Sequence, residues 1–248
     1  MVTPTQKKML VALNGQQTET PPLWLMRQAG RHLKEYLEIR AQAENFLDFC
    51  YTPDLAVEAT LQPIRRYGFD AAILFSDILV IPDALGQQVD FVPGTGPKLE
   101  AISSVEGLKK LSKDRLHDHL APVYEAIGRI RNELPDETTL IGFAGAPWTV
   151  ATYVVEGGGS KDYQTTRKWA YGAPEEFGAL IDILVDATAD YLIRQIDSGV
   201  EAVQLFDSWA GVLPPGQFDK WSIEPAKKII ARIREKHPDT PIIGFPRG

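Results

Sequence analysis

The sequence predicts an α/β protein built around a parallel β-sheet. Short apolar runs alternate with longer segments whose apolar residues recur at helical spacing. Polar residues directly follow several of these runs, among them Arg27, Asp77 and Ser208. This alternation is typical of βαβ units, whose ligand sites lie at the carboxyl ends of the strands. Two architectures satisfy the pattern: an open doubly wound sheet, or part of a (β/α)₈ barrel.

We expect five short parallel strands, each an apolar run bounded by polar or turn residues. They cover residues 23–26, 71–75, 139–143, 202–206 and 241–245. No glycine-rich dinucleotide turn follows residues 23–26, which disfavours the doubly wound sheet. Five strands are too few to close a (β/α)₈ barrel. No repeat, linker or low-complexity tract divides the chain, so we expect one α/β-barrel domain over residues 1–248.

Helices are predicted between these strands from their caps and apolar periodicity. A helix begins at Thr52 and Pro53, ends near Gly68 and contains Pro63; others cover residues 116–134, 174–198 and 224–236. Ser103 and Glu106 have capping-box spacing. Residues 88–99 predict a hairpin whose turn lies at residues 93–98.

Bulk composition excludes several classes of function. A net charge of −7 and a pI near 5.2 argue against a nucleic-acid surface, which needs clustered cations. Cys50 is the single cysteine, so neither a disulfide framework nor a thiolate zinc cluster is expected. No apolar run approaches the roughly 18 residues that a membrane span needs, and no signal-peptide core follows Met1. We therefore expect a cytoplasmic protein whose partner is a small molecule.

Arg27 and Arg31 are the first candidate ligand-binding residues. If the chain turns helically after Met26, their side chains share one face, because they are four residues apart. Arginine presents a planar fork of donors that matches a carboxylate at two points. The pair therefore suits a substrate with several carboxylates. The alternative is that both arginines lie on the surface and pair with Glu35 and Glu38.

Four motifs, in order along the chain, resemble the uroporphyrinogen decarboxylase family. They are MRQAGR at residues 26–31, FSDILV at 75–80, GFAGAPWTVATYVVEGGGS at 142–160 and LFDSWAG at 205–211. The resemblance implies a homodimeric (β/α)₈-barrel enzyme without a metal or organic cofactor. It would remove carbon dioxide from the four acetate side chains of uroporphyrinogen III, giving coproporphyrinogen III. Members of this family extend beyond the length of this chain and supply the last barrel strands. We therefore expect an incomplete barrel that lacks its C-terminal βα units.

The resemblance also implies roles for individual residues. Arg27, Arg31 and Arg40 correspond to arginines for the substrate carboxylates, and Asp77 to the carboxylate that holds the pyrrole nitrogens. Asp77, Arg27 and Tyr153 are the expected catalytic residues. The expected substrate-binding residues are Arg27, Gln28, Arg31, Arg40, Asp77, Tyr153, Phe206 and Ser208.

Other interpretations remain open at this point. From the residues alone, Asp77 and Ser208 also suit helix caps, and Tyr153 also suits packing. A chain lacking C-terminal units could bind tetrapyrrole carboxylates without turnover. A third possibility is a methyltransferase of the same superfamily, with a zinc site of histidine and cysteine ligands. The single cysteine, with no histidine two residues away, argues against that site.

Overall fold

Four parallel strands form the central sheet of the protein. The computed structural model describes residues 7–92 and 94–248. Its main sheet has the order β1 (Ala71–Ile73), β4 (Thr139–Gly145), β5 (Ala202–Asp207) and β6 (Ile242–Pro246). All three neighbouring pairs are parallel. Within the described residues the sheet stays open, with β1 and β6 at its edges. The fold is therefore α/β and corresponds to part of a (β/α)₈ barrel.

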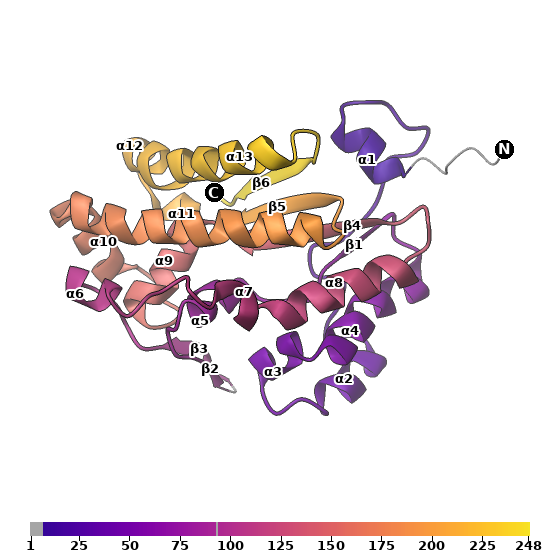
Figure 1. Cartoon of the computed structure of the whole chain (residues 1–248), viewed down its shortest axis with the longest axis horizontal. Coiled ribbons are helices and arrows are strands. Elements are labelled where there is room, and N and C mark those ends of the chain that lie inside the picture. Colours follow the sequence, from indigo (N-terminus) through magenta and orange to yellow (C-terminus); the bar gives the residue numbers. More distant parts are fainter. Residues whose placement is uncertain (1–6, 93) are drawn as a thin grey trace.

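Helices connect these strands and cover the outer face of the sheet. In Figure 1 the long helix α11 (Pro174–Asp197) runs across the sheet, between α13 (Glu224–Lys236) and α8 (Ala121–Glu133). α4 (Pro53–Tyr67) packs against α8. The remaining helices are α1 (Lys8–Leu13), α2 (Lys34–Arg40), α3 (Phe46–Tyr51), α5 (Val80–Ala84), α6 (Val105–Leu108), α7 (Leu116–His119), α9 (Pro147–Glu156), α10 (Gln164–Gly172) and α12 (Pro215–Phe218). Short 3₁₀ and π turns cover Ala210–Val212 and Asp219–Ile223.

The predicted amphipathic helix over residues 174–198 is confirmed as α11. Its apolar face, including Phe177, Leu184 and Leu192, is buried in the main hydrophobic core. Its opposite face carries acidic residues that form ion pairs, such as Asp182 with Lys228. Gly199 follows with φ of 122°, a conformation that glycine adopts without strain. The helices predicted over residues 52–67 and 224–236 are confirmed as α4 and α13.

The predicted strand over residues 23–26 is wrong. These residues form no strand, and Leu23 and Leu25 are 57% and 51% exposed. The segment lies beside the start of β1 without joining the sheet: the Asp70 N–H donates to the Leu23 carbonyl at 2.9 Å. The Leu23 N–H donates to the Asp70 carboxylate at 2.8 Å. An apolar run alone therefore did not distinguish a strand from a surface segment, and the sheet has four parallel strands instead of five.

Three further predictions need smaller corrections. The helix over residues 116–134 is divided into α7 and α8 because Pro122, in the first turn of α8, has no N–H with which to continue α7. The cap near residue 104 uses Ser104 instead of Ser103, and its hydroxyl accepts the Gly107 N–H at 3.3 Å. The hairpin is confirmed as β2 (Val89–Val92) and β3 (Gly96–Leu99), so Gly96–Lys98 belong to a strand rather than to the turn.

Candidate active site

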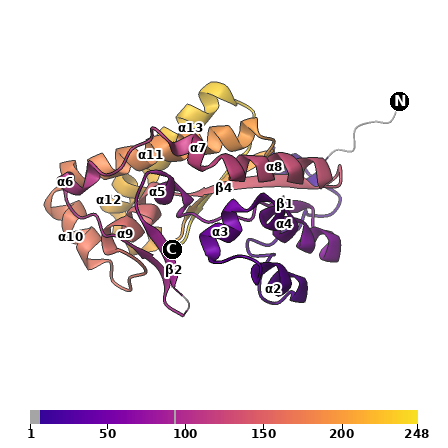
Figure 2. The ribbon, with the colours of Figure 1, turned by 60° about the horizontal axis from the view of Figure 1, so that its bottom comes forward.

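A cavity of about 490 Å³ opens at the carboxyl ends of the parallel strands. Its walls are formed by the strand ends, α2, α3 and the β2–β3 hairpin. Phe46 of α3 and Phe91 of β2 pack against each other in this wall, with ring centres 5.0 Å apart. Figure 2 shows β2 and α3, which carry Phe91 and Phe46, on the side of the ribbon opposite α13. The lining residues are Met26, Arg27, Gln28, Ala29, Tyr36, Phe46, Ile73, Leu74, Phe75, Ser76, Asp77, Ile78, Leu79, Phe91, Pro97, Phe143, Tyr153, Phe206, Ser208, Trp209 and Arg247. A largely apolar cavity with a few polar groups is the usual form of a small-molecule site.

Asp77 is the acidic side chain of this cavity. It lies in the turn between β1 and α5, where its carboxylate accepts the Leu79 N–H at 2.8 Å. Burial raises its pKa from 3.8 to about 6, and the Leu79 hydrogen bond and the Arg27 charge oppose that shift. At neutral pH Asp77 is therefore mostly ionised, while its environment gives that charge little solvation.

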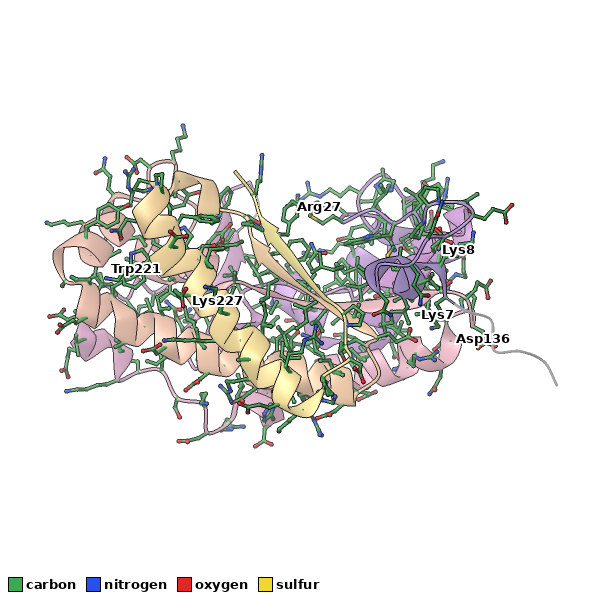
Figure 3. All side chains as sticks on the ribbon, turned by 90° about the horizontal axis from the view of Figure 1, so that it is seen from above. Lys7, Lys8, Arg27, Asp136, Trp221 and Lys227 are labelled. Carbon is green, nitrogen blue, oxygen red and sulfur yellow. The ribbon has the colours of Figure 1, made fainter. Side chains whose placement is uncertain are left out.

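Arg27 lines the same cavity, in the turn that leaves residues 23–26. Buried Gln28 holds this turn: its side-chain NH₂ donates to the Ala71 carbonyl at 3.1 Å, and its oxygen accepts the Leu25 N–H at 3.2 Å. Gln28 thus fastens the Arg27 turn to the start of β1. Figure 3 shows Arg27 well apart from Lys7 and Asp136.

Arg31 and Arg40 do not line the cavity. Residues 26–32 form successive turns and no helix. The expectation that Arg27 and Arg31 share one helix face is therefore wrong. Arg31 is exposed, as the surface alternative expected, but among the described residues it forms no ion pair with Glu35 or Glu38, and Glu35 pairs with Arg66 at 2.9 Å. The Arg40 guanidinium donates to the Ala43 carbonyl at 3.2 Å and lies 5.8 Å from the centre of the Phe49 ring.

Tyr153, Phe206 and Ser208 line the cavity on the side of β5 and α9. Burial raises the pKa of the Tyr153 phenol, which keeps it protonated and able to donate a hydrogen bond. Phe206 lies in an aromatic wall, with ring centres 5.4 Å from Phe143 and 5.9 Å from Phe245. Together with Arg27, Gln28 and Asp77, six of the eight predicted site residues line one cavity.

Several lining residues were not predicted from the sequence. They include Ser76, which precedes Asp77 in the second motif, and Trp209, which follows Ser208 in the fourth. Their positions inside recognised motifs were the available signal. Tyr36 lies in a segment for which no element was predicted, Phe91 lies in the predicted hairpin, and Arg247 follows the predicted strand over residues 241–245. No motif marked these three.

A second cavity of about 560 Å³ lies on the outer surface, between α7, α8 and α11. Two of its polar groups already have partners within the protein: His117 hydrogen-bonds Tyr124 at 3.0 Å, and Asp190 pairs at 3.0 Å with Lys113, which lies outside the lining. It lies on the helical side and holds none of the predicted site residues. We therefore assign the functional site to the cavity at the strand ends.

Over residues 7–92 and 94–248, no three His, Cys, Asp or Glu side chains come together as a potential metal site. Among the same residues, no helix combines the length and apolar character needed to cross a membrane.

The parallel sheet and the cavity at its carboxyl edge place the protein in the α/β-barrel class, with a candidate site for a small molecule. The sequence model of one family, described as uroporphyrinogen decarboxylase (URO-D), matches residues 4–248. The chain belongs to this family. It spans 70–71% of the length of the uroporphyrinogen decarboxylases from Rhodospirillum rubrum and a Chelativorans species.

Individual relatives agree with the family match. A uroporphyrinogen decarboxylase from Rhodospirillum rubrum is 54% identical over 244 residues, which cover 98% of this chain and 70% of the relative. One from a Chelativorans species is 56% identical over 243 residues, with 98% and 71% covered. Among solved structures, a methyltransferase from Methanosarcina mazei superposes with a TM-score of 0.74 at 18% identity, covering 91% of this chain and 66% of the other. At that identity, the likeness supports the fold alone.

Proposed function

We propose that this protein decarboxylates the four acetate side chains of uroporphyrinogen III to give coproporphyrinogen III. The observation that carries the proposal is the placement of Asp77 and Arg27 in one cavity at the strand ends. A macrocycle with inward pyrrole N–H groups and outward carboxylates needs an acceptor at its centre and cations at its edge. Asp77 supplies the acceptor, and Arg27 supplies one of the cations. Membership of the uroporphyrinogen decarboxylase family supports the same reaction.

The substrate provides its own electron sink in this reaction. Protonation of a pyrrole ring at the carbon that bears the acetate makes the ring nitrogen iminium-like. The bond between the methylene and the carboxylate then breaks, carbon dioxide leaves, and the two electrons neutralise the iminium. A proton added to the methylene carbon gives a methyl group and the aromatic ring returns when the ring proton leaves. The net change is one proton taken up and one carbon dioxide released for each acetate.

Asp77 has the central role in this proposal. An ionised carboxylate only accepts hydrogen bonds, so it matches pyrrole N–H donors. Its negative charge, held in a poorly solvated position, stabilises the cationic ring more than the neutral one. Comparable preorganised groups contribute about 3 kcal/mol to the transition state.

Arg27 and Tyr153 act on the carboxylate that leaves. The Arg27 guanidinium binds it in a bidentate manner and orients a water or a substrate carboxyl group that delivers the proton, because a guanidinium is too weak an acid to deliver it itself. Tyr153 donates its phenol hydrogen to an acetate oxygen. Phe206 and Ser208 contact the ring and a side chain, and Gln28 acts by holding the Arg27 turn. Arg31 and Arg40 do not line the cavity, and no part in the reaction is proposed for them.

The test is anaerobic incubation of the protein with uroporphyrinogen III, followed by oxidation and chromatography of the porphyrins. We expect products with seven, six, five and four carboxyl groups to appear in turn. Binding of uroporphyrinogen without loss of carboxyl groups would contradict turnover and favour a chain that only binds tetrapyrrole carboxylates. Absence of both binding and turnover would reject the site.

We also propose that residues 1–248 act as one domain, in a cytoplasmic homodimer. One hydrophobic cluster containing Ala56, Tyr124, Phe177 and Ile233 supports the single domain. The dimer and the location rest on the family resemblance. Light scattering on the purified protein tests the dimer, and a monomer mass at micromolar concentration would reject it.

A further inference from the structure

A second guanidinium, that of Arg247, lines the same cavity as Arg27. The two arginines enter it from opposite edges of the sheet. Arg27 precedes β1, and its turn is fastened to Ala71 at the start of that strand, whereas Arg247 directly follows β6. β1 and β6 are the first and last strands in the sheet order. Three inter-strand spacings of about 4.8 Å separate these edges by roughly 14 Å on a flat sheet, and by less on a curved one.

The backbone of Arg247 is held firmly in place. Its N–H donates to the Asp207 carbonyl at 3.0 Å, and its carbonyl accepts the Gly211 N–H at 2.9 Å. Gly211 permits this approach because a Cβ atom there would lie 2.8 Å from the Arg247 carbonyl oxygen. The strand end and the turn after β5 therefore fix the point from which the side chain projects.

The Arg247 side chain has no carboxylate partner in the part of the chain that the structure describes. It is exposed on the cavity side, whereas Arg66, Arg129 and Arg232 all pair with acidic side chains. The cavity thus contains two arginines and one aspartate, within a chain whose net charge is −7. This local excess of positive charge favours an anionic ligand.

We propose that Arg247 binds a second carboxylate of the substrate, at the rim opposite Arg27. The inference rests on the proposed function and extends it to the orientation of the ring. Arg27 holds one edge of the tetrapyrrole, Asp77 faces its central N–H groups, and Arg247 holds a carboxylate on the far edge. A polyacid wide enough to reach both arginines is then selected over a smaller one.

The test measures the binding of uroporphyrin III, a stable oxidised macrocycle with the same carboxylates, by titration of its absorbance. Arg247→Gln keeps the hydrogen-bonding backbone and removes the charge. The matched control is Arg167→Gln, an exposed arginine in α10 that lines neither cavity. We expect Arg247→Gln to raise the Kd about tenfold, equivalent to about 1.4 kcal/mol. The control is expected to stay within twofold of the wild type. The difference should shrink as sodium chloride is raised, because salt screens the lost charge.

A second variant tests the placement of Arg247 without removing its charge. Gly211→Ala forces the Arg247 carbonyl and Gly248 to move, so we expect it to raise the Kd for uroporphyrin severalfold at unchanged net charge. Circular dichroism and thermal unfolding confirm that each variant is folded.

The outcomes separate the two proposals. If the wild type binds uroporphyrin and Arg247→Gln binds equally well, the Arg247 proposal is wrong and the proposed function stands. Equal losses in Arg247→Gln and Arg167→Gln would also overturn it, because they would reflect net charge alone. No binding by the wild type would reject both proposals together.

Discussion

Asp77 and Asp207 occupy similar positions in the fold but differ in their surroundings. Both lie at the carboxyl ends of parallel strands, Asp77 after β1 and Asp207 as the last residue of β5. Asp207 is 4% exposed, and its two oxygens accept the hydroxyls of Thr149 and Ser222. Asp77 accepts one backbone N–H and faces the cavity that Arg27 lines.

The contrast shows what separates a structural carboxylate from one available to a ligand. Thr149 also accepts the Trp209 N–H at 3.0 Å, so Asp207 ties α9, β5 and the turn at Asp219–Ile223 together. Burial raises the pKa of Asp207, and the two hydroxyl donors oppose the shift. Both carboxylate oxygens of Asp207 thus already accept hydrogen bonds from within the protein. Asp77 retains acceptor capacity beside a guanidinium, which suits the binding of external N–H donors.

The largest effect is expected from Asp77→Asn. Asparagine keeps the size of the side chain and an oxygen for the Leu79 N–H but loses the charge. We expect turnover of uroporphyrinogen to fall at least about a hundredfold, the range found for loss of a preorganised charged or polar group. Asp136→Asn, at an exposed position far from the cavity, is the matched control. If Asp77→Asn turned over substrate at close to the wild-type rate, Asp77 would have a structural role, like Asp207, and no catalytic one.

Asp207→Ala should act on stability instead. It leaves the buried hydroxyls of Thr149 and Ser222 without their acceptor, at a cost of about 2 kcal/mol in the free energy of unfolding. Urea denaturation measures the loss, and Asp136→Ala should change the midpoint little. Unchanged stability with abolished turnover would reverse the roles assigned to the two aspartates.

Arg27→Lys tests the cation that faces Asp77. Lysine keeps the charge but cannot form the bidentate contact with a carboxylate, so turnover should fall at least about tenfold. Arg167→Lys provides the control on the surface of α10. Wild-type kinetics in Arg27→Lys would remove Arg27 from the mechanism.

The smallest predicted effect is a pH dependence of stability. The folded-state pKa of Asp77, about 6, lies above the 3.8 of an unperturbed aspartate, so the folded protein holds its proton more tightly than the unfolded chain. The contribution of Asp77 to stability therefore decreases as pH rises from about 4 to 6 and is constant above that range. Asp77→Asn removes this dependence, and above pH 6 it should be more stable than the wild type, because the folded protein no longer has to hold a poorly solvated charge at this position. Urea midpoints of the two proteins at pH 4, 5, 6 and 7.5 measure the difference. A constant difference across that range would show that the surroundings of Asp77 do not shift its pKa.

Periodicity and capping predicted the longer helices. Helix α13 begins and ends where its caps and apolar spacing indicated, and α11 buries the predicted face. Gly68, with φ of 64°, ends α4 as expected. These elements depend on local sequence, because the backbone and its near neighbours determine where each begins and ends. Residues 23–26 failed for the opposite reason: their environment is set by Asp70, which is distant in sequence.

Prediction of the site residues likewise succeeded for some residues and failed for others. The motifs predicted Arg27, Asp77, Tyr153 and Ser208 as site residues, and all four line one cavity. Spacing also linked Arg31 to Arg27, and this failed because the chain forms turns where a helix was assumed.

The sequence by itself determined the α/β class, the family and the identity of the cavity aspartate, because each of these depends on local patterns and motifs. Only the tertiary structure distinguished Asp77 from Asp207 and brought Arg247 opposite Arg27. Both outcomes depend on contacts between segments far apart in the chain, which set the burial of each charged group and the partners available to it.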